Sequence, residues 1–336
     1  MAVLGTQNPT LTDLAKLLDP QGNIGPVVEI LTAVNEILLD MPWMEGNLPT
    51  GHRSNIRTGL PAPTWRRFYA GVQPTKGHTA QVTDDCGMLE AYAEVDKALA
   101  DLNGQTAAFR FQQDKGHIEG MSQEIASNIF YGNAGLAPEK FNGLAPRFAT
   151  RNKATAETAD NVIHAGGAGS DNTSVWLIGW SEDKVTGIYP KGSKAGIQVR
   201  DMGEVTIENA DGAGGRMQAY RTHCRWDCGL TVPDWRYVVR IPNIATGSLT
   251  KDAASGADLV DLMVDAMERL PSLTNCRPVF YVNRTIRSFL RRQMKNAKNV
   301  QLTLEQVAGK HVLMLDGVPV RRCDALLSTE ALVPNT

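Results

Sequence analysis

The sequence lacks the features of a membrane-spanning or secreted protein. No apolar run approaches the roughly 20 residues that a helix needs to cross a bilayer, and the first residues carry no signal-peptide pattern. Cysteine is scarce, and its five copies are an odd, scattered set, which is typical of reduced thiols rather than of a disulfide framework. These absences predict a soluble globular protein that is made in a cytoplasm. The cysteines are Cys86, Cys224, Cys228, Cys276 and Cys323.

Motifs of known chemistry are also missing. The sequence contains no GxxxxGKS/T, GxSxG, HExxH or CxxC, and its glycine-rich stretches "HAGGAGSDN" and "DGAGGRM" lack the spacing of nucleotide-binding loops. His223, Cys224 and Cys228 form one candidate metal cluster, but their spacing suits a tetrahedral site poorly and no fourth ligand is near. On a strand, the two cysteines share a face, as small buried side chains do. We therefore predict no catalytic, cofactor-binding or metal-binding residues, and a protein that is not an enzyme.

The net charge of −2 is small, but the charges form blocks of alternating sign. Residues 1–45 and 84–102 are mostly acidic, whereas residues 46–83 contain no acid at all. Residues 269–298 carry eight basic side chains and no acid. Such blocks are typical of solvated faces, and they also suit self-complementary surfaces that meet between identical chains.

The basic block over residues 46–83 is also poor in aliphatic side chains. It holds four prolines and five glycines, so it cannot bury a core or form a helix of its own. Aromatic residues make up 6% of the chain, yet Trp65, Phe68 and Tyr69 gather within this block. The composition predicts an extended arm whose partner lies outside its own fold.

Helical periodicity is clearest in the first half of the chain. Leucines at helical spacing predict short helices over residues 10–20 and 25–43, and a long helix is predicted over 105–131. Residues 88–102 fit a strand and a helix equally well. The apolar face of the long helix is expected to hold Ala108, Phe111, Ile118, Met121, Ile125 and Ile129.

The second half of the chain mixes strands and helices without a regular repeat. A surface loop is expected over residues 133–172, and a helix over 255–270 with Ser255 as its N-cap. Asp316-Gly317 between two apolar runs is the strongest hairpin signal. Strands are expected at 174–181, 185–190, 234–241 and 277–282, a strand hairpin at 204–227, and a basic helix at 284–298.

The order of these elements resembles the major capsid protein of tailed double-stranded-DNA bacteriophages, which has the Hong Kong 97 fold. The stretches "VQPTKGHTAQVTDDCGMLEAYAEVDKALADLNG", "GSDNTSVWLIGW", "IYPKGSKAG" and "DWRYVVRI" are similar to those of one group of these proteins. The resemblance implies an α+β fold with an N-terminal arm, an extended β-hairpin loop, a spine helix and a mixed α/β axial domain. The implied domains are an N-terminal arm (1–45), an extended loop (46–85), a peripheral domain (86–170) with the spine helix (105–131), an axial domain (171–320) with strands that return to the peripheral domain, and a C-terminal segment (321–336).

The same resemblance implies a structural viral protein. Its copies would assemble into the hexamers and pentamers of an icosahedral shell around packaged double-stranded DNA. The implied partners are other copies of the chain, a scaffolding protein, a portal, a decoration protein and non-specifically contacted DNA, with no membrane and no cofactor. The implied location is the virion, after assembly in the cytoplasm of a bacterial host.

Within this interpretation, the arm contacts an adjacent subunit. Its aromatic and basic side chains would bind acids of that subunit, either from the acidic strand that follows the arm or from the N-terminal arm. The expected inter-subunit residues are Arg53, Arg57, Trp65, Arg66, Arg67, Phe68, Tyr69, Lys76, Asp84, Glu90 and Asp96.

Two alternatives remain open at this point. One is a non-enzymatic DNA-binding or packaging protein that uses the basic helix 284–298, although the near-neutral net charge argues against it. The other is an enzyme of unknown α/β type, for which the sequence supplies no candidate site.

Overall fold

The computed structural model describes residues 35–102, 104–208, 214–250, 256–293, 302–307 and 310–335. These residues fall into two compact units. Unit 1 contains residues 88–125 and 196–227, and unit 2 contains residues 34–87, 126–195 and 228–336. The helix expected over residues 10–20 lies outside the described residues. Of the helix expected over 25–43, residues 35–43 are described, and they are helical only in the short helix α2 (Ile37–Asp40), whereas Trp43 begins a strand.

The long helix expected over residues 105–131 is confirmed as α4 (Thr106–Tyr131). In unit 1 it accompanies three strands and the short helix α3 (Lys97–Asp101). The ambiguous stretch 88–102 is strand as far as Asp96, whose carboxylate then caps α3 by accepting a hydrogen bond from the Ala98 amide at 2.8 Å. The strands are β3 (His78–Asp96), β6 (Gln198–Glu208) and β7 (Arg216–Thr231).

The expected apolar face of α4 is wrong in its first turns. Phe109 is 0% exposed and packs with Val95 and Ala100, whereas Phe111 is 67% exposed. Residues that are two positions apart in sequence point about 200° apart around a helix, so one ring faces inward and the other outward. Farther along, Ile125 and Ile129 are buried as expected.

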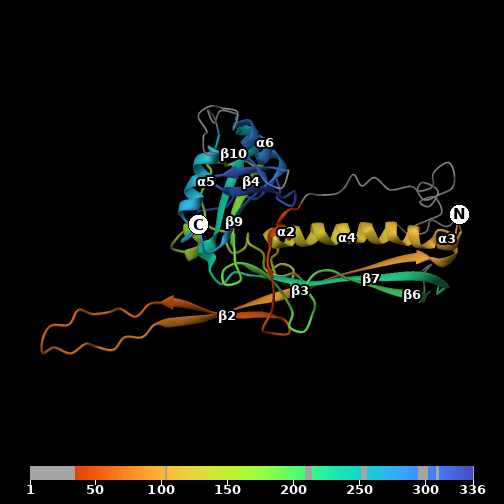
Figure 1. Ribbon diagram of the computed structural model, residues 1–336, viewed down its shortest axis with the longest axis horizontal. Helices are drawn as coiled ribbons and strands as arrows, with labels where there is room; N and C mark the ends of the chain where they lie inside the picture. The colour runs from red at the N-terminus through yellow and green to blue at the C-terminus, as the bar shows by residue number, and fades with distance from the viewer. Residues whose placement is uncertain are drawn as a thin grey trace. The chain divides into compact units, whose positions relative to one another are not determined.

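The core of unit 2 is a mixed sheet with the order β10-β11-β12-β9-β4-β8. Neighbouring strands are antiparallel except for β12 and β9, which are parallel. All residues of β4 are buried, and helices α5 and α6 lie beside the sheet (Figure 1). The elements are β4 (Asn172–Trp180), β8 (Val238–Ala245), β9 (Arg277–Val282), β10 (Leu302–Val307), β11 (Lys310–Leu315), β12 (Val318–Arg322), α5 (Leu259–Glu268) and α6 (Arg284–Gln293).

Several boundaries differ from those expected. Asp258 caps α5 by accepting hydrogen bonds from two backbone amides, and Ser255 lies outside the described residues. Helix α6 is described as far as Gln293. The hairpin at Asp316-Gly317 is confirmed, with φ values of 47° and 82° that the tight turn requires. Strand β10 is an element that the sequence analysis missed.

Residues 133–172 are mostly loop, as expected, but the expectation that they lie on the surface is wrong for part of them. Phe141, Leu144 and Phe148 from this segment are buried, and the Phe148 ring meets Trp176 of β4 edge-on at a centroid distance of 6.1 Å. The remaining elements are β1 (Trp43–Glu45), β2 (Gly51–Gly59), β5 (Thr186–Tyr189) and the 3₁₀ turns η1 (Glu157–Asn161), η2 (Trp235–Tyr237) and η3 (Thr246–Ser248).

Candidate assembly surface

The basic arm is an extended two-stranded hairpin. Strand β2 pairs with the first part of β3 in antiparallel register, from Gly51 opposite Asp85 to Gly59 opposite His78. Beyond the strands the two chain segments continue to a turn, and residues 60–81 are all exposed (Figure 1). Backbone pairing therefore gives the arm its form without a core.

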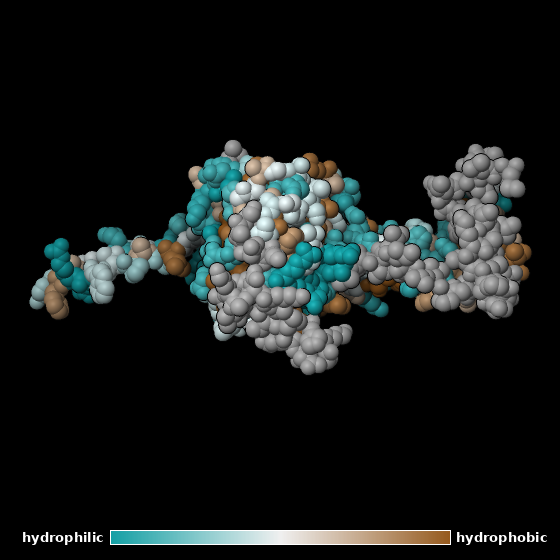
Figure 2. All heavy atoms as spheres, turned by 90° about the horizontal axis from the view of Figure 1, so that it is seen from above, coloured by the Kyte–Doolittle hydropathy of each residue, from teal (hydrophilic) through white to brown (hydrophobic). Residues whose placement is uncertain are grey.

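Three aromatic side chains of the arm are fully exposed around its turn. Trp65, Phe68 and Tyr69 have relative exposures of 101%, 95% and 105%. Tyr69 has a φ of 62°, in the left-handed region that bulky residues rarely adopt. Arg66 Nε donates to the Ala70 carbonyl at 3.0 Å across this turn. The arm is the narrow projection in Figure 2, where hydrophobic and hydrophilic side chains alternate on its surface.

The basic side chains of the arm point into solvent. Arg53 Nε reaches the Thr83 hydroxyl on the paired strand at 3.2 Å, and Arg57 and Lys76 are exposed. Within the described chain, no carboxylate forms a salt bridge with any of the arm's basic residues. Arg53, Arg57, Arg66, Arg67 and Lys76 therefore keep their charge available for an external acid.

Asp84 does not belong with this outward-facing set, and the expectation that it faces another subunit is corrected here. Its side chain is 5% exposed and accepts hydrogen bonds from Arg147 Nη2 at 2.8 Å and from Thr231 Oγ1 at 2.7 Å. Both carboxylate oxygens are thus occupied by residues of the same chain. Neighbours on a strand point to opposite faces, and Asp85 is the exposed member of the pair.

The other two expected acids lie on β3 in unit 1. Glu90 is exposed, 3.3 Å from His223 Nε2 and 3.6 Å from Arg225 Nε. Asp96 is half-buried, and one of its oxygens caps α3. Of the three acids, Glu90 is the exposed one, and His223 and Arg225 of the same chain lie beside its carboxylate.

The acids just before the arm have partners within the chain. Glu36 lies 3.2 Å from Arg321 and 3.6 Å from Arg287, and Asp40 accepts from the Tyr281 hydroxyl at 3.2 Å. Burial raises the pKa of the Asp40 carboxyl above its ordinary value, although Arg321 lowers it. Glu36 and Asp40 thus already have partners within their own chain.

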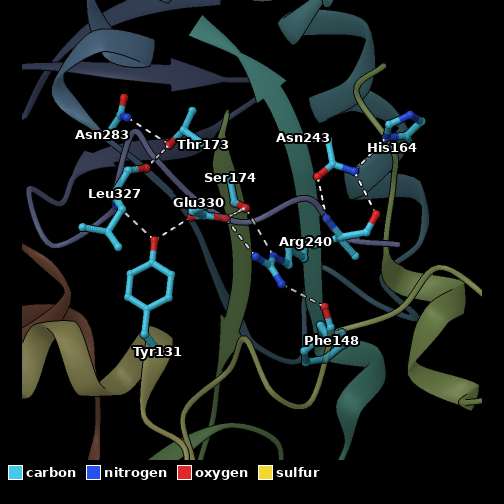
Figure 3. A network of polar contacts seen from close by, with 11 residues as sticks. Tyr131, Phe148, His164, Thr173, Ser174, Arg240, Asn243, Asn283, Leu327 and Glu330 are labelled. Atoms are coloured by element: carbon cyan, nitrogen blue, oxygen red, sulfur yellow. Dashed lines mark hydrogen bonds and ion pairs between the residues drawn. The ribbon is translucent and has the colours of Figure 1, made fainter. Parts of the chain in front are cut away.

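A buried polar network fastens the C-terminal segment to the core of unit 2 (Figure 3). The Glu330 carboxylate accepts hydrogen bonds from Tyr131 at 2.5 Å, from Arg240 at 2.8 Å and from Ser174. Arg240 also donates to the Phe148 carbonyl at 3.0 Å. Burial raises the pKa of the Tyr131 hydroxyl well above its ordinary value, and the Glu330 charge acts in the same direction.

The network continues along the last residues. Thr173 donates to the Leu327 carbonyl at 2.7 Å, and the Leu327 amide donates to the Tyr131 hydroxyl at 3.0 Å. Asn243 exchanges two hydrogen bonds with the Val333 backbone, at 2.9 and 3.1 Å. No local pattern in the sequence indicates this network, because its partners lie 90 or more residues apart.

Two of the five cysteines lie together on one strand. Cys224 and Cys228 are buried on the same face of β7, as the strand spacing predicted. In the described part of the chain, no three potential metal-ligating side chains come together. None of the helices described there combines the length and apolar character needed to cross a bilayer.

Comparison with known proteins identifies the fold and the family. Residues 19–334 match the family model of the major capsid protein GP7. The chain belongs to this family. The match agrees with a mixed α+β architecture of the Hong Kong 97 type, so the fold expected from the sequence is confirmed, and with it the structural role of a tailed-phage major capsid protein.

One solved structure gives the same result. A chain of the structure of bacteriophage Epsilon15 is 37% identical to this chain, with 100% of both chains covered and a TM-score of 0.80. The capsid of bacteriophage JBD30 is 11% identical, with 88% of this chain and 93% of that chain covered and a TM-score of 0.49. No curated protein is similar enough to this chain to be counted as a relative. The protein is therefore a component of the virion shell, built from copies of itself.

Proposed function

We propose that copies of this chain form the hexamers and pentamers of an icosahedral shell around double-stranded DNA, and that the arm of each copy binds a neighbouring copy. The arm is residues 46–85. The observation that carries this proposal is the full exposure of Trp65, Phe68 and Tyr69 on a hairpin that has no core. Exposed aromatic and arginine side chains are the groups that dominate the energetics of protein interfaces.

Charge complementarity supports a second copy as the partner of the arm. Residues 46–83 of the arm carry basic side chains and no acid, and the arginines and lysine among them have no acidic partner within the described chain. The same polypeptide carries an exposed acid at Glu90 on β3, and Asp96 lies six residues farther along the strand. Individual exposed ion pairs contribute about 0–1 kcal/mol, so their main effect here is to select and orient the partner, while the aromatic rings supply the affinity.

Hydrogen exchange tests the arm contact directly. Amides of residues 60–81 should exchange quickly in free subunits and slowly in assembled shells. The triple variant Trp65→Ala, Phe68→Ala and Tyr69→Ala should lose shell formation in electron micrographs, while its free energy of unfolding changes by at most about 0.5 kcal/mol per substitution. Leu136→Ala is the matched control, because Leu136 is 86% exposed but lies outside the arm. Equal exchange in subunits and shells would contradict the proposal.

A second surface supports contact with the packaged DNA. Arg284, Arg291 and Arg292 of α6 are exposed, whereas Ile286 and Leu290 of the same helix are buried. Arginines of this kind bind phosphates without reading sequence, and each phosphate contact contributes about 0.9 to the slope of log affinity against log salt concentration. Changing the three arginines to glutamine should reduce that slope. Arg66→Gln with Arg67→Gln, two exposed arginines of the arm, should leave it unchanged.

The remaining assignments complete the same proposal. A scaffolding protein, a portal and a decoration protein would join the shell, the assembly would take place in the host cytoplasm, and the chain would act without catalysis. In the proposed domains, residues 86–170 are peripheral and 171–320 are axial, with strands that return to the peripheral domain. Residues 196–227 share unit 1 with residues 88–125, which supports the returning strands, while residues 126–170 fall in unit 2.

A further inference from the structure

The base of the arm holds a buried charge whose contacts reach two other parts of unit 2. Asp84 is the first fully buried residue of β3 after the exposed part of the arm. Its Oδ1 atom accepts from Arg147 Nη2, and its Oδ2 atom accepts from Thr231 Oγ1. One carboxylate thus joins the arm to the loop after α4 and to the end of β7.

Both partners of Asp84 are themselves fixed. Arg147 also donates to the backbone carbonyls of Gly143 and Leu230, at 3.2 and 3.3 Å, and its own carbonyl accepts from Thr158 at 2.8 Å. Thr231 is 0% exposed and pairs with Thr186 of β5. Because neither partner can move without breaking further hydrogen bonds, the position of the carboxylate is set by the body of unit 2.

The backbone is also tightly packed at the base of the arm. A Cβ atom on Gly51 would lie 2.1 Å from the Asp84 carbonyl oxygen, and one on Gly229 would lie 2.8 Å from the Asp85 carbonyl oxygen. Strand β3 therefore passes between two glycines, one on β2 and one on β7, that approach its backbone too closely for any side chain. The arm is held on both sides at its base.

Farther out, the contacts of the arm run along the arm itself. The side-chain hydrogen bonds described there are Arg53 with Thr83, Arg66 with Ala70, and Thr75 with Ala62. They stiffen the hairpin but do not tie it to the rest of unit 2. The direction of the arm is consequently decided where its strands enter the body.

We propose that Asp84 is a positioning residue: its bridge to Arg147 and Thr231 fixes the direction in which the arm leaves unit 2, so that the aromatic turn meets its site on a second copy. This inference rests on the proposed function of the arm for its consequence, but the anchoring itself is a property of the single chain. Asp84 acts here through the placement of Trp65, Phe68 and Tyr69.

The anchoring can be measured in free, full-length subunits. Spin labels can be attached to non-canonical amino acids that replace Gln73, in the arm, and Glu157, in η1. This labelling chemistry avoids the five native thiols. Wild type should give a narrow distance distribution, and Asp84→Asn a broad one. Amides at the base of β2 and β3 should exchange roughly tenfold faster in Asp84→Asn, because a charge-assisted buried hydrogen bond is lost.

A neighbouring carboxylate supplies the matched control. Asp85→Asn makes the same chemical change one residue away on the exposed face, and it should keep the wild-type distance distribution and exchange rates. Thr231→Val removes one of the two bonds and should broaden the distribution less than Asp84→Asn, which keeps the test available if Asp84→Asn does not fold. A narrow distance distribution in both Asp84→Asn and Thr231→Val would overturn the inference.

The assembly readout separates this inference from the proposed function. Folded Asp84→Asn subunits should form fewer shells than Asp85→Asn subunits under the same conditions. If the arm becomes mobile and shell yield does not change, the positioning role is wrong even though the anchor exists. If wild-type arm amides are not protected in shells, the arm contact between copies is wrong, whatever the spin labels show.

Discussion

Two tryptophans of unit 2 lie in opposite environments. Trp176 in β4 is 0% exposed, with the Phe148 ring against its edge and the Arg240 guanidinium 5.0 Å above its ring centroid. Trp65 in the arm is 101% exposed. The sheet buries its aromatic rings to stabilise its own fold, whereas the arm obtains its shape from strand pairing and leaves its rings free for a partner.

The charges of the two regions differ in the same way. In the sheet, Arg240 and Glu330 are both buried and satisfy each other, while the arginines of the arm are solvated and have no acidic partner within the described chain. Side-chain substitutions should therefore change the free energy of unfolding strongly in the sheet and weakly in the arm. Substitutions in the arm should instead change how well the subunits assemble into shells.

The largest effect on stability is expected from Glu330→Ala. This change leaves the buried Arg240 charge unpaired and removes the acceptor of Tyr131 and Ser174, which should lower the free energy of unfolding by about 3–5 kcal/mol. Urea denaturation measures the loss. Glu139→Ala, at an exposed position of the same unit, should change it by less than about 0.5 kcal/mol.

A double variant sharpens the interpretation. Replacing both charges, Arg240→Met with Glu330→Leu, should recover part of the loss, because no buried charge is then left unpaired, while Tyr131 and Ser174 still lack their acceptor. A loss of less than about 1 kcal/mol in Glu330→Ala would instead show that water reaches the network, and the contrast between sheet and arm would be smaller than described.

Two phenylalanines on α4 repeat the comparison within one helix. Phe109→Ala should lower the free energy of unfolding by about 3 kcal/mol, because it empties a buried site beside Val95 and Ala100. Phe111→Ala, with the same change at a position 67% exposed, should cost less than about 0.5 kcal/mol. Thermal or urea unfolding of the two variants measures the difference, and equal losses would contradict the assignment of the buried face.

Elements with local signals could be predicted from the sequence. Helix α4, strand β9 and the turn at Asp316-Gly317 were found because helical periodicity, β-branched runs and turn chemistry are all encoded within a few residues. The exposed arm was found for a related reason: a stretch with no acid and little aliphatic content cannot form a core.

Features that depend on distant partners could not be predicted. Phe148 lies in a loop without periodicity, and its burial depends on Trp176, which a different element supplies. The Arg240–Glu330 pair joins residues 90 apart. In the pair Asp84-Asp85, strand alternation shows that one carboxylate points inward, but Arg147 and Thr231 decide which one.

The smallest effect on the free energy of unfolding is expected from a change of pH, through the contact between Asn243 and His164 at the end of the C-terminal network. Asn243 Oδ1 accepts from the Val333 amide, so its Nδ2 atom faces His164 Nδ1 as a donor, at 3.1 Å. This contact requires a neutral imidazole. Burial lowers the pKa of His164 below its ordinary value of 6.5, and the Arg151 charge lowers it further.

The His164 imidazole therefore binds a proton less readily in the folded state than in the unfolded state. Its contribution to the free energy of unfolding is complete above the unfolded-state pKa near 6.5, and it falls as the pH drops toward the lower folded-state pKa. His164→Gln keeps an acceptor but does not titrate. The difference in unfolding free energy between wild type and this variant, measured from about pH 7.5 to about pH 5.5, should change in favour of the variant. A constant difference would show that His164 titrates alike in both states.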